Sequence, residues 1–129
     1  MGKTSAWALL IGRFLMALIF IVAGAGKIGS YGGTQEYMQA MGVPGAVLPL
    51  VILTELGGGL AICFGLKTKL VAILLAGFSV VSGVIFHHNF ADQVQAIMFM
   101  KNLAMAGGFL VLAASGAGAI SLDEKFRKP

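Results

Sequence analysis

The 129-residue chain has few charged residues and a single cysteine. Charged residues make up only 11% of the sequence and apolar residues 58%, whereas an ordinary soluble domain has about 25% charged residues. A soluble protein of this size needs polar side chains over most of its surface, and this chain has too few. The apolar content excludes a disordered chain, and the lone Cys63 excludes a disulfide scaffold. An integral membrane protein remains.

Four apolar segments are long enough to cross about 30 Å of hydrocarbon as helices. None alternates with a period of two, and only a helix satisfies its own backbone in lipid. Together these segments use most of the chain, so we expect a single membrane domain over residues 1–129. The sequence therefore predicts an all-α membrane protein, an antiparallel four-transmembrane-helix bundle with spans at about 6–26, 46–66, 70–90 and 94–114.

The connections between these segments are short, which predicts antiparallel neighbours. Spans one and two are joined through a helix-like run from Thr34 to Met41, with Thr34 as its N-cap and Gly42 at its end. We expect this short helix at the membrane interface. Pro49 falls in the first turn of span two, where a missing N–H costs little. The turn Lys67-Thr68-Lys69 joins spans two and three.

Basic residues are distributed unevenly between the two ends of the spans. With the N-terminus inside, the outer loops contain only Lys27, and the inner segments contain six: Lys3, Lys67, Lys69, Lys125, Arg127 and Lys128. Because positive residues favour the cytoplasmic side, we expect both termini in the cytoplasm. The basic residues form no stripe with aromatic side chains, so we expect no nucleic-acid partner.

Three ionisable residues fall inside the apolar segments: Arg13, Glu55 and Lys101. A charge at the bilayer centre costs roughly 2.5–3.5 kcal/mol on insertion scales, so each needs a partner or a function. Ala17, Phe20, Gly24 and Lys27 continue the face of Arg13 along span one.

Two interpretations of these charges are open. Arg13 and Lys101 could reach toward Glu55 from opposite sides, as a structural ion-pair network or as the lining of a polar cavity for a ligand. The two cations could instead extend separately to the two interfaces. Two cations against one carboxylate leave a formal excess of +1, which an anionic or electron-rich ligand would relieve.

The other polar positions give no metal or haem signature. His87 and His88 lie at the outer end of span three, but adjacent helical side chains project about 100° apart and cannot both bind one metal. Haem ligation would need histidines from facing helices. We therefore expect no metal site and no cofactor encoded by the chain. His87 could hydrogen-bond a quinone-like headgroup, with Lys27 nearby in the first outer loop.

Several short motifs, in order along nearly the whole chain, resemble the DoxX family of small bacterial membrane proteins, and most closely its short YqjF-like inner-membrane branch. The motifs are Arg13 with Ala23-Gly24-Ala25-Gly26-Lys27-Ile28, Tyr37-Met38 with Gly42-Val43-Pro44, Glu55-Leu56-Gly57-Gly58-Gly59, Gly65-Leu66 with Thr68, Phe86-His87, Lys101-Asn102-Leu103, and Gly116-Ala117-Gly118 with Ser121 and Asp123.

This resemblance implies a four-helix protein of the bacterial inner membrane. The family is linked to quinone and thiosulfate redox chemistry through quinol-oxidase subunits, and other members to oxidative stress or to responses to catechols and quinones. The family motifs fall on five residues that we take as candidate ligand-binding positions: Arg13, Lys27, Glu55, His87 and Lys101. Because the chain has no redox-active dithiol, electron transfer would need a partner subunit or a bound quinone.

The leading hypothesis is a redox-associated membrane protein with a polar intramembrane pocket for a quinone-like or phenolic molecule. Arg13, Glu55 and Lys101 would line this pocket, and His87 would lie at its outer mouth. A second hypothesis is a non-enzymatic membrane subunit that docks a redox or stress-response partner protein. A third is a small permease, which would require a homo-oligomer because four helices are few for a transport path.

Overall fold

A computed structural model of the chain describes residues 2–127, which contain helices and no strand. Four helical segments are long and apolar enough to cross a membrane, and they confirm the four predicted spans: Lys3–Gly29, Gly45–Phe64, Thr68–Phe86 and Gln93–Ser115. The chain divides into two compact units, one containing residues up to Lys67 and from Ala117 onward, the other Thr68–Gly116. A single domain over the whole chain stays a prediction.

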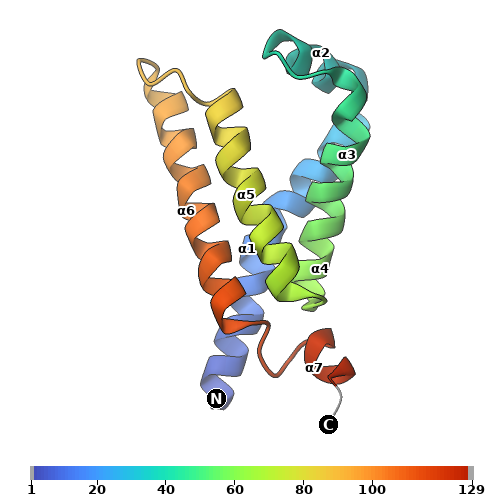
Figure 1. The fold of residues 1–129 in the computed structure, drawn as a ribbon, viewed down its shortest axis with the longest axis vertical. Coiled ribbons are helices and arrows are strands. Elements are labelled where there is room, and N and C mark those ends of the chain that lie inside the picture. Colours follow the sequence, from blue (N-terminus) through green and yellow to red (C-terminus); the bar gives the residue numbers. More distant parts are fainter. Residues whose placement is uncertain (1, 128–129) are drawn as a thin grey trace. The chain divides into compact units, whose positions relative to one another are not determined.

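In the first unit, helix α1 (Lys3–Gly29) packs against the second span (Figure 1). That span begins with a 3-10 turn, η1 (Gly45–Val47), and continues through α3 (Leu48–Ile52), a π-helical turn η2 (Leu53–Gly57) and α4 (Gly58–Phe64). Pro49 is in the first turn of α3, as predicted. The buried residues of α1 recur at helical spacing and form one stripe: Ala6, Arg13, Ala17, Phe20 and Gly24.

The predicted short helix between spans one and two is present as α2 (Tyr31–Ala40). It begins three residues earlier than expected, because Ser30 alone interrupts the helical path and its carbonyl already accepts from the Thr34 backbone (2.9 Å). Thr34 is therefore inside the helix, not at its N-cap. The helix ends at Ala40, one residue before the predicted Met41, and the predicted terminator Gly42 follows with a left-handed φ of +85°. The Gln35 amide donates to the Gly45 carbonyl (3.0 Å), which ties α2 to the start of span two.

The second unit is a hairpin of α5 (Thr68–Phe86) and α6 (Gln93–Ser115). Across it the Asn102 amide donates to the Ser79 carbonyl (3.0 Å) and to the Ser82 hydroxyl (3.3 Å). These bonds satisfy a polar side chain between two apolar helices, where van der Waals contact and hydrogen bonds must replace the hydrophobic drive. They also set the register of the hairpin.

Two boundaries of α5 differ from the prediction. The turn before it is Gly65–Lys67, so Lys69 is already helical, whereas the prediction centred the turn on Thr68. At the other end α5 stops at Phe86, four residues short of the predicted Phe90. The physical reason is the His88 ring, whose Nδ1 lies within 3.0 Å of the Val84 and Ile85 carbonyls and occupies acceptors that the helix would use to continue.

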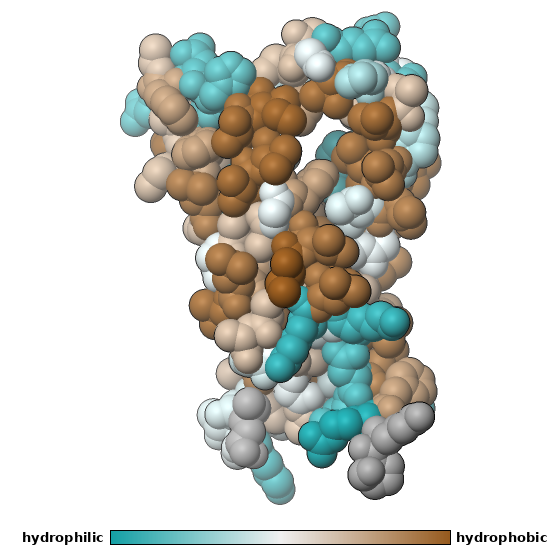
Figure 2. Space-filling model, in the orientation of Figure 1, coloured by the Kyte–Doolittle hydropathy of each residue, from teal (hydrophilic) through white to brown (hydrophobic). Residues whose placement is uncertain are grey.

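A short helix that was not predicted from the sequence, α7 (Leu122–Phe126), follows the fourth span. The Ser121 hydroxyl accepts from the Glu124 backbone (3.1 Å), which is the first half of an S-x-x-E capping box. Within the first unit, α7 lies at the same end as the start of α1, and α2 lies at the opposite end (Figure 1). Figure 2 shows hydrophobic side chains over the flanks of the helices and hydrophilic ones gathered near their ends.

Candidate intramembrane polar site

Glu55 is buried in the second span, within the π-helical turn η2. A π-helical turn contains one extra residue, breaks the regular hydrogen-bond ladder, and recurs at functional sites. The neighbouring Thr54 hydroxyl donates to the Leu50 carbonyl (2.8 Å) and so keeps its own polar group satisfied in an apolar helix. No pattern in the sequence indicates this π-helical turn. The turn determines the direction in which the Glu55 side chain points.

The backbones of α1 and the second span approach closely beside Glu55. A Cβ atom added at Gly24 would lie 2.9 Å from the Leu56 backbone nitrogen, and one added at Gly59 would lie 2.9 Å from the Ile21 side chain. Only glycine permits these approaches. The contact brings Lys27, one helical turn beyond Gly24, next to Glu55, the residue before Leu56.

Lys27 and Glu55 form an ion pair, with 2.7 Å between Lys27 Nζ and Glu55 Oε1. The Glu55 side chain is only 7% exposed and that of Lys27 is 29% exposed. Glu55 Oε1 accepts no aligned hydrogen bond, so the contact is electrostatic and not a well-directed bond. Two predicted site residues are thus brought together, and the pair is formally neutral. In the sequence, this contact was indicated by the helical spacing that places Lys27 on the same face of span one as Arg13.

Arg13 is buried at the other end of the same unit. Its Nη1 donates to the Ala117 carbonyl (3.2 Å) and its Nη2 to the Ile120 carbonyl (2.7 Å). The expectation that Arg13 reaches toward Glu55 is therefore wrong. The guanidinium lies beside Gly65, ten residues after Glu55 and so about 15 Å further along the helical span. Its partners are instead two backbone carbonyls of the segment that follows α6, a contact that neither interpretation of the sequence named.

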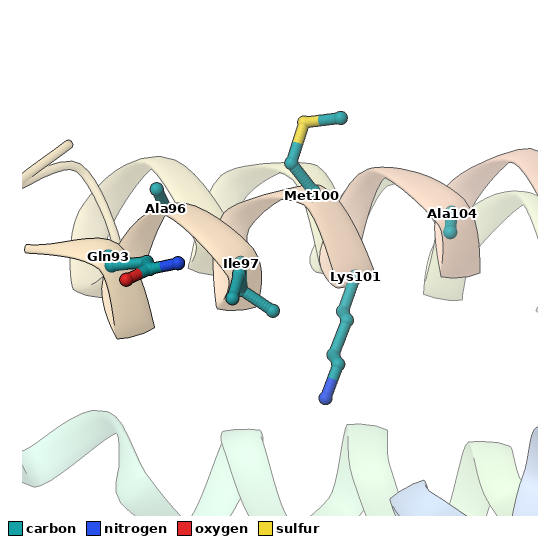
Figure 3. Close-up of a pocket in the computed structure, with 6 residues that line it drawn as sticks. All are labelled: Gln93, Ala96, Ile97, Met100, Lys101 and Ala104. Carbon is teal, nitrogen blue, oxygen red and sulfur yellow. The ribbon is translucent and has the colours of Figure 1, made fainter.

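Lys101 belongs to the second unit and is exposed on α6. A depression of about 350 Å³ runs along this helix, lined by Gln93, Ala96, Ile97, Met100, Lys101 and Ala104. Figure 3 shows the Lys101 side chain extended away from the helix, with Met100 on the opposite side. Within residues 68–116 the amine has no hydrogen bond or ion pair. The one carboxylate of this stretch, Asp92, instead caps α6 by accepting from the Val94 backbone (2.9 Å).

His87 lies just beyond α5, half-buried, and its backbone donates to the Gly83 carbonyl (2.9 Å). Gly83 packs against Asn102, so His87 is one helical turn nearer to the α5–α6 connection than Lys101. Over residues 2–127, no three side chains of His, Cys, Asp or Glu are grouped so as to hold a metal ion.

Comparison with known proteins decides the family. The DoxX family model matches residues 8–88, more than half of the chain. The chain belongs to the DoxX family. It is 54% identical to the inner membrane protein YqjF of Escherichia coli over 128 residues, which is 99% of this chain and 98% of that protein. No solved structure matches the chain.

Two further relatives extend the comparison. The inner membrane protein YphA of Escherichia coli is 38% identical over 131 residues, covering 96% of this chain and 94% of YphA. The putative oxidoreductase CatD of Bacillus subtilis is 32% identical over 76 residues, covering 59% of this chain and 57% of CatD. With four apolar helices and relatives named as inner membrane proteins, this DoxX-family chain is an inner-membrane protein.

Proposed function

We propose that this DoxX-family protein takes part in redox chemistry of the inner membrane by binding a quinone-like or phenolic molecule within the bilayer. The observation that carries the proposal is Lys101, an exposed amine without a partner in its own unit, beside a shallow, open apolar depression of about 350 Å³ along one face of α6. A quinone has an apolar ring and carbonyl acceptors. It would lie along Ile97 and Ala104 and accept a hydrogen bond from the amine.

The relatives and the cysteine count support a redox association in which the chain is not the electron carrier. One relative, CatD, is named as a putative oxidoreductase. The chain has one cysteine, so it cannot form a dithiol–disulfide couple within itself. The electrons would therefore be exchanged by the bound molecule or by a partner subunit.

The ion pair Lys27–Glu55 supplies a second polar position within the membrane. Its carboxylate can accept from a phenolic hydroxyl and its amine can donate to a carbonyl. His87 would take the role of a hydrogen-bonding group toward the end of α5. The excess of basic residues at the end of the first unit where α7 lies favours both termini in the cytoplasm.

A binding titration tests the proposal. The full chain in lipid nanodiscs is titrated with a quinone that has a short side chain, and compared with Lys101→Met and the control Lys69→Met on the same helical hairpin. A lost charge-assisted hydrogen bond is worth about 1.5–3 kcal/mol, so Lys101→Met should weaken binding by about 10- to 100-fold. Equal binding by all three proteins, or no binding by the wild type, would overturn the proposal.

The second candidate is a non-enzymatic membrane subunit that docks a redox partner. It is favoured by the way the first unit satisfies its own charges, since Arg13 is bound by carbonyls and Glu55 by Lys27. In this case Glu55→Gln lowers stability in detergent and leaves quinone binding unchanged, and crosslinking in the membrane recovers a partner protein.

A further inference from the structure

The segment from Ala117 to Arg127 folds back against the end of the hairpin formed by α1 and the second span. The Asp123 backbone donates to the Gly65 carbonyl (2.8 Å), and the Asp123 carboxylate accepts from the Lys67 backbone (2.6 Å). Both bonds connect residues far apart in the sequence. We call residues 117–127 the strap.

Arg13 lies beneath the strap and is a second attachment for it. Its two terminal nitrogens donate to the Ala117 and Ile120 carbonyls, and the residue is only 1% exposed. The third donor, Nε, is buried without a hydrogen-bond partner. The Asp123 side chain, also on the strap, attracts the guanidinium electrostatically.

Two glycines with positive φ make room for this arrangement. Gly65 has a φ of +70°, and a Cβ there would overlap the Arg13 guanidinium and lie 2.5 Å from the Ser121 side chain. Gly118 has a φ of +89°, and a Cβ there would lie 2.9 Å from the Leu9 side chain. Any other residue at either position strains the backbone and displaces the strap.

The strap is a weak partner for the group that it covers. A guanidinium matches the paired oxygens of a carboxylate or phosphate, which bind it in a charged, bidentate fork. Here two neutral carbonyls of separate residues occupy that fork and leave Nε unused. If the strap lifts, both carbonyls and the Asp123 charge leave together, and Arg13 remains as an uncompensated cation level with Gly65, where the second span ends.

We propose that the strap is a releasable cover over an oxyanion-binding site whose ligand-binding residue is Arg13. The ligand class is a phosphate, either free or in a lipid headgroup, since both reach the end of a membrane span. Binding of the anion and docking of the strap exclude each other because they use the same guanidinium nitrogens. This site is separate from Lys27, Glu55 and Lys101, so its test is independent of quinone binding.

Native-state proteolysis measures the release of the strap. Trypsin cleaves after Lys125, which lies inside α7, so cleavage requires the strap to open first. The full chain in a maltoside detergent, which contains no phosphate, is digested, and the cleavage after Lys125 is followed by mass spectrometry separately from cleavage after Arg127, which lies beyond α7. The variants are Arg13→Gln and Gly118→Ala, with Gly107→Ala as a matched control, because a Cβ at Gly107 meets nothing within 4 Å.

We expect Gly118→Ala to be cleaved about tenfold faster than wild type and the control to be unchanged, since cleavage follows the open population. Inorganic phosphate, compared with chloride at equal ionic strength, should accelerate cleavage of the wild type but not of Arg13→Gln. Acceleration by added phospholipid alone would assign the site to a lipid headgroup. No acceleration of wild-type cleavage by either phosphate source would overturn the oxyanion site, and slow cleavage of folded Arg13→Gln would overturn the strap.

Discussion

Replacing Lys27 by methionine leaves the Glu55 carboxylate buried without a counter-ion. The two side chains meet at 2.7 Å inside the first unit, and Glu55 is only 7% exposed. Attraction between the charges offsets the cost of removing them from water, and it is lost completely when one partner is removed. This substitution therefore tests whether the pair holds α1 against the second span.

The expected magnitude follows from the burial of the two partners. Removing one partner of a buried ion pair costs about 3–5 kcal/mol. Because Lys27 is 29% exposed and the contact is not an aligned hydrogen bond, we expect the lower limit, about 3 kcal/mol, for Lys27→Met. Glu55→Leu should cost less, about 1–2 kcal/mol, because the remaining lysine can extend its amine toward the interface.

The double variant Lys27→Met/Glu55→Leu separates the ion pair from the packing around it. An apolar pair of similar volume is often as stable as the ion pair that it replaces, so the double variant should lie within about 1 kcal/mol of wild type. The free energy of unfolding is measured by reversible denaturation in mixed micelles, with the exposed Glu36→Gln as the control. A coupling energy near zero between the two substitutions would refute the reasoning.

Three other predictions concern packing, polar contacts and topology. In the same denaturation assay, Gly24→Ala should destabilise the protein by about 2 kcal/mol, because the added Cβ meets the backbone of the second span. Gly26→Ala is the control and should change the free energy of unfolding by less than about 0.5 kcal/mol, because a Cβ there meets open space. Asn102→Leu should cost about 1–2 kcal/mol through its two lost hydrogen bonds, and Asn89→Ala, in the exposed connection, should cost almost nothing. Reporter fusions should place both termini in the cytoplasm, and activity of either fusion on the outer side would contradict the predicted orientation.

The four spans and the family could be predicted from the sequence because both signals are local. A run of about 20 apolar residues must become a helix in lipid, whatever lies next to it. The same holds for the short helix before Gly42 and for Pro49 in a first turn. Even the inward face of α1 was visible, since Arg13, Ala17, Phe20 and Gly24 recur at helical spacing.

Boundaries were less accurate where a local contact changes the hydrogen bonding at a helix end. The His88 ring contacts carbonyls that would have continued α5, and the Ser30 backbone carbonyl already accepts from the Thr34 backbone, so α2 begins before the predicted cap. The helix α7 was not predicted, although Ser121 and Glu124 have the spacing of a capping box in the sequence. The predicted ligand-binding residues stay predictions, with Lys27 and Glu55 in contact and Arg13 apart from them.

The sequence by itself determined that Arg13, Glu55 and Lys101 would be embedded in apolar helices, because that follows from the residues on either side of them. Only the tertiary structure decided their partners within the first unit. Glu55 meets Lys27 because a π-helical turn and the close approach at Gly24 set the register of two spans. Arg13 meets the carbonyls of a segment more than 100 residues away. A charged side chain pairs with the group that tertiary packing places next to it. Packing between segments that are distant in the sequence produces no periodic pattern along the chain, so these partners could not be predicted from the sequence.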